Sequence, residues 1–172
     1  MKVTSLNIPD VLLIEPRVFE DARGFFFESF REDVFKKETS LNVSFVQDNH
    51  SKSSQGILRG LHYQSPPHAQ RKLVRVIQGE VLDIAVDIRE SSPTCGQYIA
   101  EILSSDNKKQ LYIPEGFAHG FLTLEPNTIF TYLVSGDYNP KSEHSIIWNT
   151  IPEIKSIIEY TIKNNKLTIM LK

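Results

Sequence analysis

Apolar residues along this chain recur mostly at alternate positions, in short runs that turn-forming residues interrupt roughly every ten positions. In the clearest run, residues 80–89, the larger aliphatic side chains fall on one face and Asp83 and Asp87 fall on the other. A strand turns successive side chains to opposite faces, so two aspartates on one face indicate either a polar interior or a solvated side. Many short strands of this kind predict a mainly β domain, a sandwich or a barrel.

The same pattern predicts the individual elements. Strands are expected within residues 9–19, 25–30, 42–48, 56–64, 71–78, 80–89, 97–103, 110–114, 120–124, 128–135 and 145–148. Short helices are expected at 31–39 and 153–163, a turn at 21–24 and a polar loop at 49–55. We expect a single domain over residues 1–172, although alternation alone does not distinguish a jelly roll from an up-and-down barrel.

Composition excludes several classes of protein. The 172 residues are 40% hydrophobic and 23% charged with a net charge of −2, so there is no global attraction to nucleic acid or anionic lipid. A single cysteine, Cys95, rules out an internal disulfide and a cysteine-based zinc site. No apolar run approaches the roughly 20 residues that span a bilayer, and residues 1–5 lack the apolar core of a signal peptide. We therefore expect a cytoplasmic protein.

The strand at 56–64 carries two side chains that need a reason to be there, Arg59 and His62. Their positions differ by an odd number, so a flat strand would place them on opposite faces, whereas a bulge or twist at Gly60 would bring them together. Further strands carry Lys72 and His119. Cations and imidazoles on separate strands are groups that a β-barrel can gather into one cavity.

A motif around His119 bears on metal binding. Pro114-x-Gly116-x-x-His119 resembles the second signature of the cupin superfamily, many members of which hold a metal with two His and a Glu from their first signature. Here His62 is followed by Tyr63 and Gln64 rather than by a second His at two-residue spacing. A ligand is therefore missing, and we expect neither a metal nor another cofactor.

Six blocks of sequence, in order and spread over about residues 9–148, carry a closer resemblance. They are Phe-Phe-Phe-Glu-Ser at 25–29, Gln-Asp-Asn-His-Ser at 47–51, Leu-Arg-Gly-Leu-His-Tyr-Gln at 58–64, Lys-Leu-Val-Arg at 72–75, Ile-Pro-Glu-Gly-Phe-Ala-His-Gly-Phe at 113–121, and Tyr138-x-Pro140-x-x-Glu143. Together they resemble dTDP-4-dehydrorhamnose 3,5-epimerase. The resemblance implies a metal-free cupin jelly roll, a homodimer, and inversion of the carbons beside the ketone of a nucleotide-linked 4-keto-6-deoxy sugar. It also implies a role in making deoxysugars such as rhamnose for surface polysaccharide.

The chemistry of that reaction explains three residue types. A C–H beside a ketone is acidic because the enolate spreads its charge onto oxygen, so the enzyme needs a base, a cation at that oxygen and an acid on the opposite face. By resemblance, His62 is the base, Lys72 stabilises the enolate and Tyr132 is the acid. A neutral imidazole suits the first role because its pKa lies near working pH, and an ammonium group suits the second.

The resemblance implies further residues at the substrate. A diphosphate needs fixed cations, and guanidinium groups suit it. The resemblance implies that Arg23 and Arg59 bind the diphosphate. Tyr138 is implied to stack on the nucleobase. Phe26 either lines the cleft or packs in the core. The other implied substrate-site residues are Glu28, Gln47, Asn49, His119 and Glu143.

The chain departs from the family pattern near the base. The family commonly ends with Leu-Ser-x-Lys-Asp, whose Asp partners the catalytic His, but here no Asp follows position 137, and Leu133 stands where Lys is common. Asp83 is the candidate partner of His62, because a buried carboxylate would fix its tautomer and raise its basicity. The alternatives are an epimerase for one carbon only or for another nucleotide-linked sugar, or a sugar-nucleotide binding cupin without activity.

Overall fold

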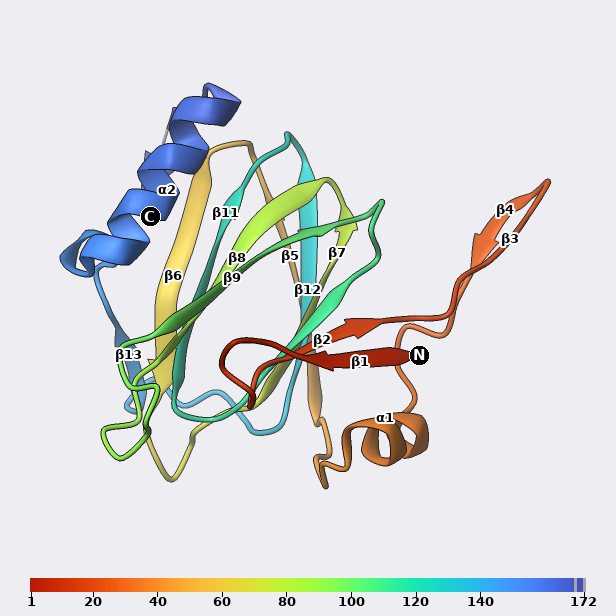
Figure 1. Cartoon of the computed structure of the whole chain (residues 1–172), viewed down its shortest axis with the longest axis horizontal. Coiled ribbons are helices and arrows are strands. Elements are labelled where there is room, and N and C mark those ends of the chain that lie inside the picture. The colour runs from red at the N-terminus through yellow and green to blue at the C-terminus, as the bar shows by residue number, and fades with distance from the viewer. Residues whose placement is uncertain (169, 172) are drawn as a thin grey trace.

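Two antiparallel sheets face each other in the computed structural model, which describes residues 1–168 and 170–171 (Figure 1). The first sheet has the order β1 (Lys2–Ser5), β2 (Leu12–Glu15), β10 (Gln110–Ile113), β7 (Lys72–Gln78), β12 (Thr128–Val134), β5 (Gln47–Ser53). The second has the order β13 (Glu143–Ser145), β6 (Ile57–Gln64), β11 (Phe117–Thr123), β8 (Glu80–Asp87), β9 (Tyr98–Ser104), and β14 (Met170–Leu171) pairs in parallel with β6. Most neighbours are not consecutive in sequence, which excludes an up-and-down barrel and fits a jelly roll.

The core has an inner and two outer parts. Between the sheets lies an apolar cluster that includes Val74 and Phe121. Helix α2 (Pro152–Asn165), preceded by the 3₁₀ turn η1 (Trp148–Thr150), covers the outer face of the second sheet with Ile154 and Ile158 (Figure 1). Helix α1 (Glu32–Thr39) buries Phe35 in a third cluster beside the first sheet.

The position of strand β8 shows whether the face that carries Asp83 and Asp87 is interior or solvated. Leu82, Ile84 and Val86 belong to the outer cluster under α2, whereas the opposite face points between the sheets. Asp83 and Asp87 on that inner face are both completely buried. The interior is therefore polar at these positions rather than the strand being solvated.

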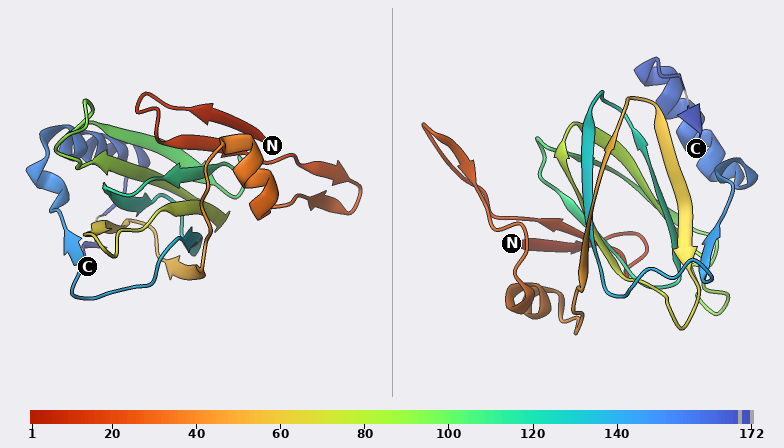
Figure 2. Two further views of the ribbon diagram at one scale, coloured as in Figure 1. Left: turned by 90° about the horizontal axis from the view of Figure 1, so that it is seen from below. Right: turned by 180° about the vertical axis from the view of Figure 1, so that it is seen from behind.

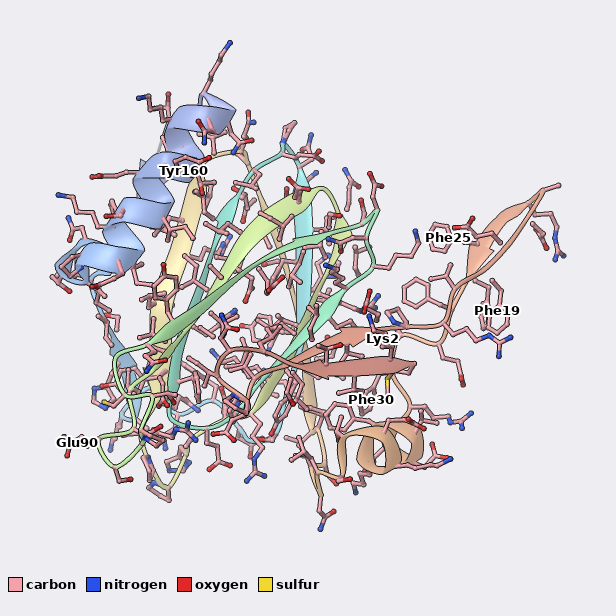
Figure 3. All side chains as sticks on the ribbon, viewed as in Figure 1. Lys2, Phe19, Phe25, Phe30, Glu90 and Tyr160 are labelled. Carbon is pink, nitrogen blue, oxygen red and sulfur yellow. The ribbon has the colours of Figure 1, made fainter. Side chains whose placement is uncertain are left out.

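A hairpin of β3 (Phe19–Asp21) and β4 (Gly24–Phe26) projects away from the sheets (Figures 1 and 2). Its phenylalanines are exposed: Phe19 by 51% and Phe25 by 58% (Figure 3), and Phe26 by 66%. Exposed aromatic side chains on one protruding element are typical of a surface that meets a partner.

Four predicted segments differ from the structure in type or in bounds. The segment 49–55, expected as a loop, is mostly strand β5, and most of 42–48, expected as a strand, precedes it. One face of strand β5 lines a polar cavity and the other is exposed to solvent. Both faces therefore carry polar residues, and the sequence shows no apolar alternation there. Of the aromatic strand expected at 25–30, only Phe25 and Phe26 lie in a strand, β4. The strand expected at 145–148 is wrong except at Ser145, because β13 ends there and Trp148 begins η1. Both helices are confirmed.

In the described part of the chain, no helix is long and apolar enough to cross a membrane.

Candidate functional site

A cavity of about 510 Å³ lies between the two sheets at one end of the molecule. The first sheet contributes Gln47, Asn49, Lys72 and Tyr132, and the second contributes Arg59, His62, His119 and Glu143. Tyr138 joins them from the connection between β12 and β13. The cavity thus gathers nine of the thirteen residues expected at the site, and it places His62 and Tyr132 on opposite sheets.

A bulge in β6 turns Arg59 and His62 into this cavity. His62 pairs with His119 and Arg59 pairs with Phe121, so β6 has one residue more than β11 between the two pairs. The backbones approach closely there: a Cβ on Gly60, whose φ is +109°, would lie 2.6 Å from the Cα of Gly120. Glycine is needed at such an approach. The expected bulge at Gly60 is therefore confirmed.

The His62 ring is exposed to the open cavity and makes no hydrogen bond to the described residues. Its neighbours across the sheet are His119 on β11 and Ser145 on β13. Partial loss of hydration lowers the pKa of His62 below its usual 6.5, the charge of Glu143 raises it, and Lys72 and His119 lower it further. The ring is consequently neutral at neutral pH, as a base for a C–H proton must be.

Asp83 was expected beside His62, and the structure corrects this. Both oxygens of Asp83 lie 3.0 Å from Nε2 of His119, and the contact is buried. Strand β11 separates β8 from β6 in the sheet, so the side chain of Asp83 meets the imidazole on the nearer strand. Asp83 lies behind the cavity wall rather than in it.

Lys72 and Tyr132 have pKa values that suit opposite tasks. Loss of hydration lowers the pKa of Lys72 to about 8, while Asp83 and Glu143 raise it, and part of the side chain still faces the cavity. The ammonium group therefore remains charged at pH 7. Loss of hydration also raises the pKa of the Tyr132 phenol above 10, so this group retains a proton to donate.

Glu143 and Tyr138 are joined to each other on the cavity wall. The Tyr138 hydroxyl donates a hydrogen bond of 2.7 Å to Oε2 of Glu143. The ring of Tyr138 is 57% exposed, so one of its faces is open to stack on a planar ligand.

Three expected substrate residues lie elsewhere. Arg23 is at the tip of the projecting hairpin, where its guanidinium pairs with Asp21, and Phe26 lies on the same hairpin. Glu28 follows the hairpin and pairs with Arg31 at 3.2 Å. None of the three lines the cavity of its own chain, and Phe26 is exposed rather than in the core.

The cavity wall also holds residues that the sequence interpretation did not single out. They are Ser51, Tyr63, Gln64, Gln70, Gly120, Phe121 and Phe130. Phe121 and Phe130 stack at 4.1 Å between centroids and form an apolar part of the wall. Gln64 is buried and donates to the carbonyl of His68. Alternation with Asn49 could have revealed Ser51, had residues 49–55 been recognised as a strand.

Among the described residues, no cluster of three or more His, Cys, Asp or Glu side chains is arranged to hold a metal ion.

Comparison with known proteins gives a consistent result. The family model described as dTDP-4-dehydrorhamnose 3,5-epimerase matches residues 5–166. The dTDP-4-dehydrorhamnose 3,5-epimerase of Shigella flexneri is 53% identical over 169 residues, which cover 98% of this chain and 91% of that protein.

Two solved structures are similar in fold. The dTDP-4-dehydrorhamnose 3,5-epimerase of Bacillus anthracis, with TDP and PPi bound, is 48% identical with a TM-score of 0.83 over 86% of this chain and 85% of that chain. A dTDP-6-deoxy-D-glucose-3,5-epimerase of Legionella pneumophila, in complex with dTDP-4-keto-L-rhamnose, is 41% identical with a TM-score of 0.86 over 99% and 87%. These neighbours support the jelly-roll assignment.

Proposed function

The chain belongs to the dTDP-4-dehydrorhamnose 3,5-epimerase family, and from this premise we propose that it inverts both C3 and C5 of a dTDP-linked 4-keto-6-deoxy sugar. The observation that supports this most is the cavity in which His62 and Tyr132 come from opposite sheets while Lys72 shares the space. The relatives of Shigella flexneri and Bacillus anthracis, 53% and 48% identical, are 3,5-epimerases by name, so an epimerase for a single carbon or a binding module without activity is not favoured. The enzyme is thus an isomerase of deoxysugar biosynthesis.

The reaction moves only protons. The neutral imidazole of His62 removes the proton from the carbon beside the ketone, and the electron pair of that C–H bond forms an enolate. The ammonium group of Lys72 stabilises the negative oxygen, which is a stronger interaction with the enolate than with the ketone. Tyr132 returns a proton to the opposite face of the carbon, and solvent then restores both groups. The same steps at the second carbon complete the product.

The remaining polar groups hold the nucleotide. Arg59 meets the diphosphate as a fixed cation, and Gln47 and Asn49 bind the nucleoside part. The exposed ring of Tyr138 stacks on the base. His119, whose Nε2 faces Asp83, directs its other ring nitrogen to the sugar.

The projecting hairpin completes the site of a second copy, so the enzyme is a homodimer. Arg23, Phe26 and Glu28 are absent from the cavity of their own chain, and the hairpin carries exposed phenylalanines. An aromatic hairpin alone in solvent is unfavourable, whereas burial in a partner would stabilise it. In the dimer, Arg23 supplies a second cation to the diphosphate.

Isotope exchange tests the reaction. Incubation with dTDP-4-keto-6-deoxyglucose in deuterated water should place deuterium at both C3 and C5, because each carbon is reprotonated from groups that exchange with solvent. Nuclear magnetic resonance of the sugar locates the label. Deuterium at one carbon only would overturn the double inversion, and the absence of label with intact protein would overturn the activity. His62→Asn is the control for label that arises without the enzyme.

Complementation between two impaired variants, assayed at substrate concentrations well below the wild-type KM, tests the exchange of hairpins. His62→Asn should lower kcat by roughly 10²–10⁴-fold because it removes the base, and Arg23→Ala should raise KM. In a mixed dimer, the intact hairpin of the His62→Asn chain would serve the intact cavity of the Arg23→Ala chain. Mixing after mild dissociation should therefore restore activity, up to about a quarter of wild type for random reassociation with one rescued site in each mixed dimer. Mixtures no more active than their parts would overturn the exchange.

A further inference from the structure

The charges that line the cavity are unequal in number. Arg59 and Lys72 are cations, and Glu143 is the one carboxylate among the described residues of the wall. The expected carboxylate, Asp83, instead faces His119. We infer that Glu143 is the positioning residue that supplies the negative charge for His62, in place of a carboxylate bonded directly to the ring. This inference rests on the proposed function and concerns what sets the basicity of the His62 imidazole.

The register of β13 places Glu143 near the base. Ser145 pairs with His62 and Glu143 pairs with Gln64, so Glu143 is two residues along from the partner of His62. Side chains two residues apart share a face of a strand, and both His62 and Glu143 line the cavity. His144, which lies between Ser145 and Glu143 in the chain, stacks on Tyr63 at 5.2 Å and anchors the short strand.

The carboxylate is held in place on one side only. Tyr138 donates to Oε2 at 2.7 Å, and the other oxygen has no hydrogen bond to the described residues. Glu143 is an exposed residue that lines the cavity, and this hydrogen bond fixes its carboxylate there.

The influence of this charge extends to each group of the proposed chemistry. Four side chains from separate strands line the same cavity as His62: Lys72 on β7, His119 on β11, Tyr132 on β12 and Glu143 on β13. Of these, Glu143 raises the pKa of His62, and it also raises those of Lys72 and Tyr132. Asp83 raises the pKa of Lys72 but does not contribute to that of His62.

Two isosteric substitutions should therefore act differently on the pH dependence of kcat/KM. Glu143→Gln keeps an acceptor for Tyr138 and removes the charge, so both the acid limb, which reports His62, and the basic limb, which reports Lys72, should move to lower pH. Asp83→Asn should move the basic limb alone to lower pH. Glu115→Gln, whose side chain pairs with Arg71 outside this cavity, is the matched control and should leave both limbs in place.

The decisive measurement does not require turnover. The chain has five histidines, and the ring resonance of His62 is identified by its loss in His62→Asn. Titration of the free protein at low ionic strength should show a lower pKa for this ring in Glu143→Gln than in wild type, with no change in Glu115→Gln. An unchanged pKa for His62 in Glu143→Gln would overturn the inference even if deuterium incorporation proceeds normally. A shifted pKa without deuterium incorporation would instead uphold the inference and overturn the proposed function.

Discussion

Strand β8 carries two buried carboxylates on one face, four residues apart, and their surroundings differ. Asp87 accepts hydrogen bonds from Arg89 at 2.8 and 2.9 Å and from the hydroxyls of Ser92 and Thr94 at 2.6 Å. Asp83 faces a single donor, Nε2 of His119. The environment rich in donors fixes the charge of Asp87, whereas Asp83 contacts one imidazole, that of His119, which lines the cavity.

The chain that follows each aspartate explains the difference. Asp87 ends β8, and the turn around Glu90 follows it (Figure 3). The donors to Asp87 come from this turn: Arg89, Ser92 and Thr94. Asp83 lies in mid-strand, where the backbone groups are used in the sheet and donors can come only from side chains on β11 and across the cavity. We therefore expect the Asp87 end to serve stability and the Asp83 end to serve chemistry.

The largest effect on this comparison is expected from Asp87→Asn. Burial opposes ionisation, but hydrogen bonds from Arg89, Ser92 and Thr94 hold the pKa of Asp87 far below its usual value. Removing the charge from this buried carboxylate deletes its ion pair with Arg89 and leaves Arg89 only its contact with the exposed Asp10, so the free energy of unfolding should fall by about 3 kcal/mol. Denaturant unfolding measures the loss, and kcat/KM per folded molecule should remain that of wild type.

Asp10→Asn is the control for Asp87→Asn. Asp10 also pairs with Arg89, at 2.8 Å, but its side chain is 56% exposed, so its removal should cost less than about 1 kcal/mol. Equal losses in the two variants would show that burial does not distinguish the two contacts. A fall in kcat/KM that exceeds the loss of folded protein in Asp87→Asn would contradict the division of roles along β8.

The sequence was most informative where apolar alternation or turn residues were strong. The helix at 31–39, the paired faces of β8 and the bulge at Gly60 follow from local periodicity and the odd spacing of Arg59 and His62, and the structure confirms them. Local patterns do not reveal which polar face meets a cavity. Strand β5 was missed for this reason, because its inward residues are polar.

The partners of buried charges could not be predicted for a different reason. Asp83 was assigned to His62 because a carboxylate beside the base is chemically attractive, but strand order decides which imidazole it reaches. Strand order depends on pairings between segments far apart in the sequence. The positions of Arg23 and Phe26 depend on the hairpin that leaves its own barrel, which no local pattern in residues 19–26 indicates.

The smallest of the expected effects is on the pH dependence of kcat/KM, and it tests whether the Asp83 end of β8 serves catalysis. Activity requires neutral His62, whose pKa is below 6.5, and charged Lys72, whose pKa is about 8. As pH rises, kcat/KM should therefore increase below pH 6.5, level off and fall near pH 8. Stability over the same range should not follow this curve, because Asp87 is ionised throughout, and the stability that its lowered pKa contributes is lost progressively as pH falls from about 3.8 toward that lowered pKa. Lys72→Arg should remove the fall near pH 8, since a guanidinium remains charged. If the fall near pH 8 persists in Lys72→Arg, it must come from a group other than Lys72. Asp83 on β8, which acts on the pKa of Lys72, would then have no part in the pH dependence of catalysis.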